Sequence, residues 1–168
     1  MVLTPVRYSF TQRFSVPVDK AFDWATDYDP EDFSLMGIEG KRKVDKLTED
    51  AYILHDITKT NRGTVEKTRL VRINPERHSL VNTHIGGPTL HSQFWYDFYP
   101  EKNGGSRLEF TGLLLYPSDR KLTKDEVSKI AAEEKKGDRQ IWKVLAKSME
   151  DDLANLAKAT RRPPKRSG

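Results

Sequence analysis

Cysteine is absent from the 168 residues of the sequence. Its absence excludes a disulfide framework, a thiolate nucleophile and a zinc site with cysteine ligands. Long apolar runs are also missing, because no segment approaches the ~18 apolar residues that a membrane span needs. Residues 1–8 lack the long apolar stretch of a secretory signal peptide. We therefore expect a cytoplasmic protein without a membrane span.

Most of the chain has no surplus of positive or negative charge. The formal net charge is +4, and residues 161–168 hold four basic residues and no acidic one. Without that tail, the basic residues only balance the 25 acidic ones. A balanced body argues against a nucleic-acid-binding domain, so nucleic acid is not an expected partner. The tail itself could contact nucleic acid or anionic lipid, but we favour a disordered, solubilising end.

The composition that remains is that of a globular protein, with 36% hydrophobic and 32% charged residues. The length suits one domain with a core of its own. We expect that domain to cover residues 1–160 and the basic tail to follow it. The oligomeric state is left open by the sequence.

The N-terminal part predicts a strand followed by two short helices. Apolar and polar side chains alternate over residues 8–16, which is typical of a half-buried strand. Pro17 ends that strand and suits the first turn of a helix. Asp29 is placed to cap a second helix, and Gly37 is placed to end it.

The central part of the chain, from residue 38 to residue 116, predicts a sheet. Segments of about ten strand-like residues alternate with turn signals. Short loops between consecutive strands predict antiparallel hairpins, and the first strand brings the total to seven. The six central segments are 38–47, 50–60, 63–74, 78–86, 89–100 and 106–116.

The C-terminal part predicts a long helix. Thr123 and Glu126 fit a capping box, and a regular apolar stripe from Ile141 to Leu156 needs a surface such as the sheet to lie on. Gly137 interrupts the pattern, so we expect a kink or break there. In that case residues 122–136 form a lid over a cavity, and the long helix proper starts near Asp138.

This order of elements resembles that of the START-like superfamily, also called SRPBCC or the birch-pollen-allergen fold. The likeness is carried by the strand-to-helix entry at 15–24, the acidic break Asp27-Tyr28 and the hairpin sequence at 104–108, and it covers roughly residues 6–160. The resemblance implies an α+β helix-grip fold. In that fold a curved, seven-stranded antiparallel sheet of β-α-α-β6-α order wraps around the C-terminal helix.

The resemblance also carries implications for function. Similar proteins bind lipids, sterols, polyketides and other hydrophobic or amphipathic molecules in a cavity between sheet and helix, and a minority are enzymes. It therefore implies a carrier or sensor of a small hydrophobic ligand, without a cofactor. The alternative is a cyclase, dehydratase or hydrolase that acts on a polyketide- or lipid-like substrate in the same cavity. Fold alone does not decide between them, and we favour binding over catalysis.

The hairpin around Asn61-Arg62 allows the strand register to be predicted. A two-residue turn there places His55 opposite Thr68 and Ile57 opposite Glu66, on one face. The other face carries Asp56 opposite Lys67. We interpret that pair as a solvent-side ion pair.

We therefore expect the face with His55 and Glu66 to point inward, although a slip of one residue would reverse the two faces. An aromatic ladder on the strand at 89–100 and the stripe of the C-terminal helix complete the expected wall. The expected ligand contacts are His55, Ile57, Glu66, Thr68, Phe94, Tyr96, Phe98, Ile141, Leu145 and Met149.

Candidate catalytic and metal-binding residues are few. His55 and Glu66 form the one acid–base pair that we can suggest, since histidine titrates near neutral pH and burial raises a carboxyl pKa. We favour the competing interpretation, in which the two polar groups are simply hydrogen-bonded within the protein or exposed to solvent. No catalytic residue is therefore predicted. No metal site is predicted either, because the spacing of the four histidines is not that of metal ligands. These are His55, His78, His84 and His91.

Overall fold

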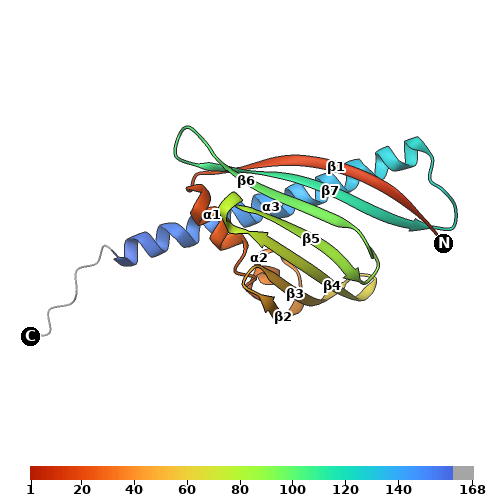
Figure 1. Cartoon of the computed structure of the whole chain (residues 1–168), viewed down its shortest axis with the longest axis horizontal. Helices are drawn as coiled ribbons and strands as arrows, with labels where there is room; N and C mark the ends of the chain where they lie inside the picture. Colours follow the sequence, from red (N-terminus) through yellow and green to blue (C-terminus); the bar gives the residue numbers. More distant parts are fainter. Residues whose placement is uncertain (161–168) are drawn as a thin grey trace, which may run out of the picture.

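The computed structural model describes residues 1–160, so the basic tail predicted at 161–168 lies outside the described part. One strand, two short helices, six further strands and one long helix follow each other along the chain (Figure 1). A short 3-10 helix, Pro75–Arg77, joins the fourth strand to the fifth. The elements are β1 (Val2–Phe14), α1 (Val18–Ala25), α2 (Asp32–Leu35), β2 (Gly40–Thr48), β3 (Ala51–Thr60), β4 (Gly63–Asn74), β5 (Ser79–Gly86), β6 (Gln93–Pro100), β7 (Ser106–Ser118) and α3 (Lys124–Thr160).

The seven strands form one antiparallel sheet in the order β1-β7-β6-β5-β4-β3-β2. The six central strands are a meander, and β1 joins it by pairing with β7. In Figure 1, α3 runs behind the sheet, where it packs against β1. The predicted helix-grip architecture, a curved seven-stranded sheet with a long C-terminal helix, is confirmed.

The register of the β3–β4 hairpin is also as predicted. Thr60 pairs with Gly63 around the two-residue turn, and His55 lies opposite Thr68. The prediction that the face with His55 and Glu66 points inward was wrong. Leu54 and Val71 are fully buried, whereas Ile57 on the opposite face is 43% exposed.

The reason for this error is the environment of Asp56, which is only 6% exposed. Asp56 forms no solvent-side pair with Lys67. It binds the guanidinium groups of Arg42 and Arg69 inside the fold. Two arginines supply the charge and the hydrogen bonds that a buried carboxylate needs, so this charged face can point inward.

The break expected at Gly137 does not occur, because α3 is continuous from Lys124 to Thr160. A glycine inside a helix costs only about 0.5–1 kcal/mol relative to alanine, and packing on both sides of it offsets that cost. Ile130 before Gly137 and Trp142 after it both pack against the core. The prediction of a separate lid at 122–136 is therefore also wrong, since the residues from 124 onward form the first turns of α3.

The helix begins as predicted. Glu126 N–H donates to Thr123 Oγ1 over 3.3 Å, and Thr123 N–H donates to Glu126 Oε2 over 2.8 Å. This reciprocal pair is a capping box, which satisfies two backbone donors at the helix start. The second helix of the chain also begins and ends near the expected residues: Asp29 Oδ1 accepts the N–H of Glu31, and Gly37 takes a positive φ of 68°.

Candidate functional site

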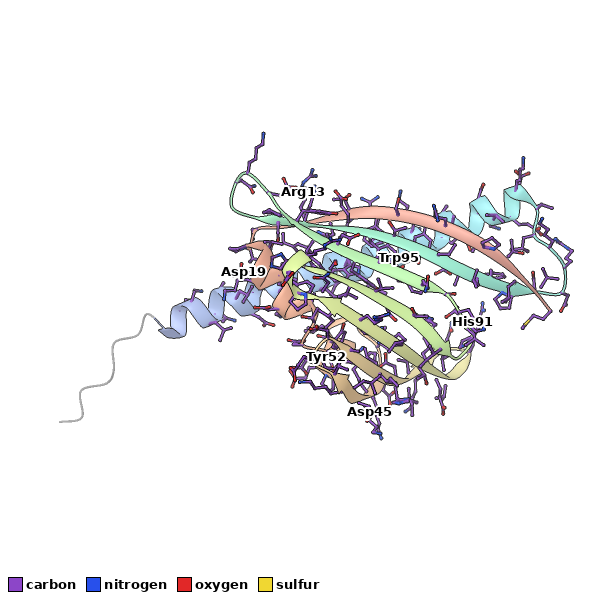
Figure 2. The ribbon with its side chains drawn as sticks, viewed as in Figure 1. Arg13, Asp19, Asp45, Tyr52, His91 and Trp95 are labelled. Carbon is purple, nitrogen blue, oxygen red and sulfur yellow. The ribbon has the colours of Figure 1, made fainter. Side chains whose placement is uncertain are left out.

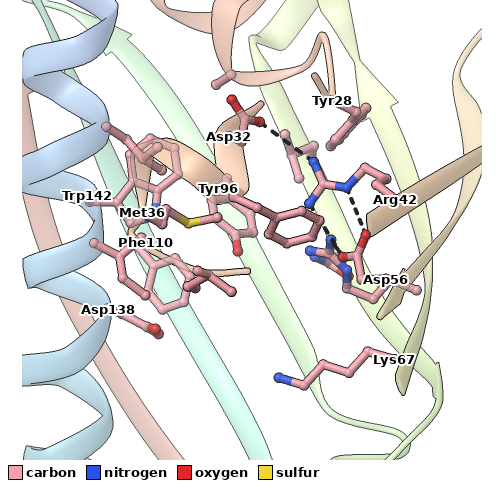
Figure 3. Close-up of a pocket in the computed structure, with 18 of the residues that line it drawn as sticks. Tyr28, Asp32, Met36, Arg42, Asp56, Lys67, Tyr96, Phe110, Asp138 and Trp142 are labelled. Carbon is pink, nitrogen blue, oxygen red and sulfur yellow. Dashed lines mark hydrogen bonds and ion pairs between the residues drawn. The ribbon is translucent and has the colours of Figure 1, made fainter. Parts of the chain in front are cut away.

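A cavity of about 310 Å³ lies between the inner face of the sheet, the α1–α2 segment and α3 (Figure 3). One part of its wall is aromatic and aliphatic, and the other part is charged. Both the volume and this mixture are typical of a pocket for a small organic ligand. The apolar part is formed by Trp24, Ala25, Phe33, Met36, Ile38, Leu80, Tyr96, Phe98, Phe110, Ile141, Trp142 and Leu145.

The apolar wall results from the alternation of strand residues and the helical period of α3. Along β6, Tyr96 and Phe98 point inward, while Trp95, which directly precedes Tyr96 and is labelled in Figure 2, belongs to the other face. On α3, Ile141 and Leu145 are four residues apart and so share one side of the helix. Trp142 stands beside them and contacts the ring of Tyr96 at 6.0 Å between centroids.

The charged wall is built around Asp56 on β3. Arg42 Nε donates to Asp56 Oδ1 over 2.8 Å, and Arg69 Nη2 donates to Asp56 Oδ2. The Arg42 guanidinium also lies 3.6 Å from Asp32 and 4.7 Å from the centroid of the Phe33 ring. Pairing of β2, β3 and β4 brings these side chains together, since Arg42 is opposite Asp56 across one strand pair.

The carboxyl group of Asp32, at the start of α2, has a raised pKa although Arg42 lies nearby. Burial, and then the charge of Asp27, raise the pKa of Asp32 to about 6. The opposing pull of Arg42 is weaker, because Arg42 is bound more closely to Asp56. The carboxyl group at this end of the cavity can therefore change its charge between mildly acidic and neutral pH.

His84 of β5 is a neutral member of the wall. It is only 7% exposed, and its Nδ1 lies 2.6 Å from Thr89 Oγ1. Burial lowers the pKa of His84 to about 4, and the positive charges of Lys67 and Arg69 contribute to the same effect. The imidazole is therefore uncharged at neutral pH.

Lys67 and Asp138 lie at the same end of the cavity, on β4 and α3 (Figure 3). The Tyr8 hydroxyl donates to Asp138 Oδ2 over 2.6 Å. Burial raises the pKa of Asp138, and burial followed by the charge of Asp138 raises the pKa of Tyr8. Burial, and then the charge of Arg69, lower the pKa of Lys67.

Three buried polar atoms of the cavity residues have no hydrogen-bond partner within residues 1–160. They are the Tyr28 hydroxyl, Arg69 Nε and Asn82 Oδ1. Buried polar groups in proteins are nearly always hydrogen-bonded, so such atoms at a cavity indicate a place for a polar ligand group or for water. The set contains donors and an acceptor, which suits a ligand that has a polar end.

The residues expected to contact a ligand fall into three groups. Tyr96, Phe98, Ile141 and Leu145 line the cavity. Phe94 and Met149 are buried in the core, at 8% and 0% exposure, without lining it. The remaining four, which were expected to point inward, are on the outer face of the β3–β4 hairpin: His55, Ile57, Glu66 and Thr68.

The outward direction of His55 removes the suggested acid–base pair from the cavity. His55 Nε2 lies 3.2 Å from Asp45 Oδ2 on the outer face, and both side chains are about two-fifths exposed. Glu66 is exposed as well. On β3 and β4, the polar groups that face the cavity were missed because they share a period of two with apolar neighbours such as Leu54 and Val71. The polar groups on the other elements were missed because only the assembled fold brings them to the cavity. The missed residues are Tyr28, Asp32, Arg42, Asp56, Thr58, Lys67, Arg69, Asn82, His84 and Asp138.

A metal centre is not formed by the described residues, which contain no group of three or more histidine or acidic side chains able to hold an ion. Within residues 1–160, no helix combines the length and apolar character required to cross a membrane.

Comparisons with known proteins find similarity in structure only. No protein-family model matches the chain, and no curated protein matches it in sequence. Among solved structures, Ara h 8.0201 is 16% identical with a TM-score of 0.66, covering 86% of this chain and 97% of its own. The Zhui aromatase/cyclase from Streptomyces sp. R1128 is 11% identical with a TM-score of 0.70, covering 95% of this chain and 99% of its own.

A third similar structure is the di-domain ARO/CYC StfQ from the steffimycin biosynthetic pathway. It is 12% identical with a TM-score of 0.72, and the match covers 90% of this chain and 52% of StfQ. Identities this low establish the fold and not the activity. The chain therefore has the helix-grip fold of the START-like, or SRPBCC, superfamily.

Proposed function

We propose that this protein binds an amphipathic small molecule in the cavity between the sheet and α3, as a carrier or sensor. The observation that carries the proposal is the division of the cavity wall. Aromatic and aliphatic side chains of β6 and α3 face a group of charged and polar side chains on β2, β3, β4 and β5 that contains unpartnered polar atoms. A ligand with an apolar body and a polar end would satisfy both parts.

The enzymatic alternative has less support from the residues. Two of the similar structures are named as an aromatase/cyclase and an ARO/CYC, so a cyclase-like activity on a polyketide- or lipid-like substrate is the second candidate at the level of the fold. The acid–base pair suggested for it, His55 and Glu66, is on the outer face of the sheet. We therefore place binding ahead of catalysis.

A cavity-filling variant tests the proposal. Leu145 lines the cavity, whereas the adjacent Val144 is 37% exposed on the same helix. In Leu145→Trp the larger side chain occupies ligand space, while Val144→Trp adds the same bulk toward solvent. Circular dichroism establishes that both variants are folded before binding is compared.

The measurements are native mass spectrometry of the gently purified full chain and a thermal-shift assay with a total lipid extract. We expect a bound species or a raised melting temperature for the original chain and for Val144→Trp, and neither for Leu145→Trp. No bound mass and no thermal shift for the original chain would contradict the proposal.

A further inference from the structure

Lys67 differs from every other charged residue of the cavity wall. Its Nζ extends from β4 into the space that faces α3 (Figure 3). Within the described part of the chain it makes no ion pair or hydrogen bond, whereas each other charged residue of the wall has a partner. Those other residues are Asp32, Arg42, Asp56 and Arg69, which form one connected group, and Asp138, which is bound by Tyr8.

Two nitrogen-containing side chains, those of Arg69 and His84, lie near Lys67 on the sheet. Arg69 follows two positions later on the same face of β4, and its Nε is buried without a partner. His84 lies opposite Arg69 on β5. The charges of Lys67 and Arg69 help to lower the pKa of His84, and the charge of Arg69 helps to lower the pKa of Lys67. Burial is the larger cause of both shifts, and the charge of Asp56, which lies opposite Lys67 on β3, acts against them. The Asp56 carboxylate is, however, already bound by Arg42 and Arg69, so it forms no ion pair with Lys67.

Two carboxyl groups on α3, Asp138 and Glu134, influence Lys67 from the opposite side. Neither lies within ion-pair distance of Lys67 in the described structure. Asp138 Oδ2 is already occupied by the Tyr8 hydroxyl, and burial raises the pKa of both carboxyl groups, so both ionise less readily than usual. They therefore leave the Lys67 ammonium without a direct counter-charge.

We propose that the cavity selects an acidic amphipathic ligand, whose carboxylate or other singly charged anionic head is bound by Lys67 Nζ and Arg69 Nε. The apolar body of the ligand then lies against Phe110, Ile141 and Trp142 on the other side of the cavity. Hydrogen bonds between charged partners are shorter and stronger than neutral ones, and removal from water strengthens them further. This inference rests on the proposed function and specifies the chemical class of its ligand.

Three probes with one aromatic body test the choice of head group. They are 2-naphthoate, 2-naphthylmethanol and 2-naphthylmethylamine, which are anionic, neutral and cationic at neutral pH. Isothermal titration calorimetry measures their binding to the full chain. We expect the acid to bind at least about tenfold more tightly than the alcohol, as a charge-assisted hydrogen bond would give.

Lys67→Met keeps the length of the apolar stem and removes the charge. It should weaken binding of the acid by about tenfold or more and leave binding of the alcohol within about twofold. Lys41→Met is the matched control, because Lys41 is an exposed lysine of the same sheet that does not line the cavity. It should change neither affinity. Lys67→Gln provides a second uncharged variant, and circular dichroism verifies that each variant is folded.

Several results would overturn the inference. Equal affinity for acid and alcohol, tightest binding of the amine, or a preference for the acid that survives in both Lys67 variants would each do so, while leaving the proposed function intact. Binding of none of the three probes also overturns it. The experiments with the lipid extract then decide separately whether the proposed function stands.

Discussion

The Tyr8 hydroxyl donates a 2.6 Å hydrogen bond to Asp138 Oδ2, and so connects the edge strand β1 to the middle of α3 across 130 residues of sequence. Tyr8 is only 6% exposed, and Asp138 directly follows the helix-interior glycine at position 137. The bond therefore fixes α3 against the sheet at the point where the sequence suggested a break.

Tyr8→Phe should lower the free energy of unfolding by about 1–2 kcal/mol, because it removes a buried hydrogen bond to a carboxyl group. The same change should raise the pKa of Asp138 further, since the Tyr8 hydroxyl opposes the effect of burial. Urea denaturation measures the first effect.

Tyr116→Phe is the control, because Tyr116 is 36% exposed and its hydroxyl has no hydrogen-bond partner within residues 1–160. An equal loss in both variants would contradict a specific role for the Tyr8–Asp138 bond.

Gly137→Ala should stabilise the protein by about 0.5–1 kcal/mol, since alanine is the better helix former and loses less backbone entropy on folding. A Cβ at this position would meet no atom within 4 Å. Gly87→Ala is the contrasting variant. Its φ is +100°, and a Cβ there would lie 2.5 Å from the Glu66 carbonyl oxygen, so it should destabilise. Thermal unfolding compares the two, and a lower melting temperature for Gly137→Ala would indicate that α3 needs flexibility at this residue.

Asp56→Ala should lower the free energy of unfolding by about 3–5 kcal/mol, because two buried guanidinium groups lose their shared carboxylate. Arg42 and Arg69 would remain inside the fold with their positive charges close together. Asp45→Ala removes a carboxylate from the exposed outer face of the same sheet and should change the urea midpoint little. If the two variants unfold at the same urea concentration, the Asp56 cluster does not contribute as we expect.

The imidazole of His84 should titrate near pH 4 in the folded protein. Because this pKa is below the ordinary value of 6.5, the unfolded chain takes up the proton first as the pH falls. The contribution of His84 to stability is therefore complete above about pH 6.5 and is lost as the pH falls toward 4. NMR of the ring protons against pH measures the midpoint.

Lys67→Met should raise the His84 midpoint, since the charge of Lys67 is one of the causes of the shift. Lys41→Met, on the exposed part of β2, should leave the midpoint in place. A His84 midpoint that is the same in the original chain and in Lys67→Met would show that Lys67 does not affect this part of the cavity.

Much of the fold could be predicted because it follows from local patterns. Alternating side chains and turn residues place the six central strands to within a few residues, and the two-residue turn before Gly63 determines the register of its hairpin. The first strand, predicted at 8–16, begins earlier, at Val2. The capping box of Thr123 and Glu126 marks the start of α3. Tyr96, Phe98, Ile141 and Leu145 were predicted to lie in the cavity because strongly apolar faces on strand and helix both have to be buried.

The charged part of the cavity could not be predicted in the same way. Both faces of the β3–β4 hairpin mix apolar and charged residues with the same period of two. The sequence alone therefore does not indicate which face is buried. A buried Asp56 requires Arg42, which lies 14 residues earlier on β2 and reaches it only when the three strands pair. Continuity of α3 through Gly137 similarly depends on packing on both sides of the glycine.

The sequence by itself therefore determined the order of the elements, the hairpin register and the contribution of Tyr96, Phe98, Ile141 and Leu145 to the apolar wall, because those depend on local periodicity and turn chemistry. Only the tertiary structure decided which hairpin face points inward and that Lys67 and Asp138 lie at the same end of the cavity. Burying a charge is favourable only when partners from distant strands and helices surround it, and that condition is set by the assembled fold.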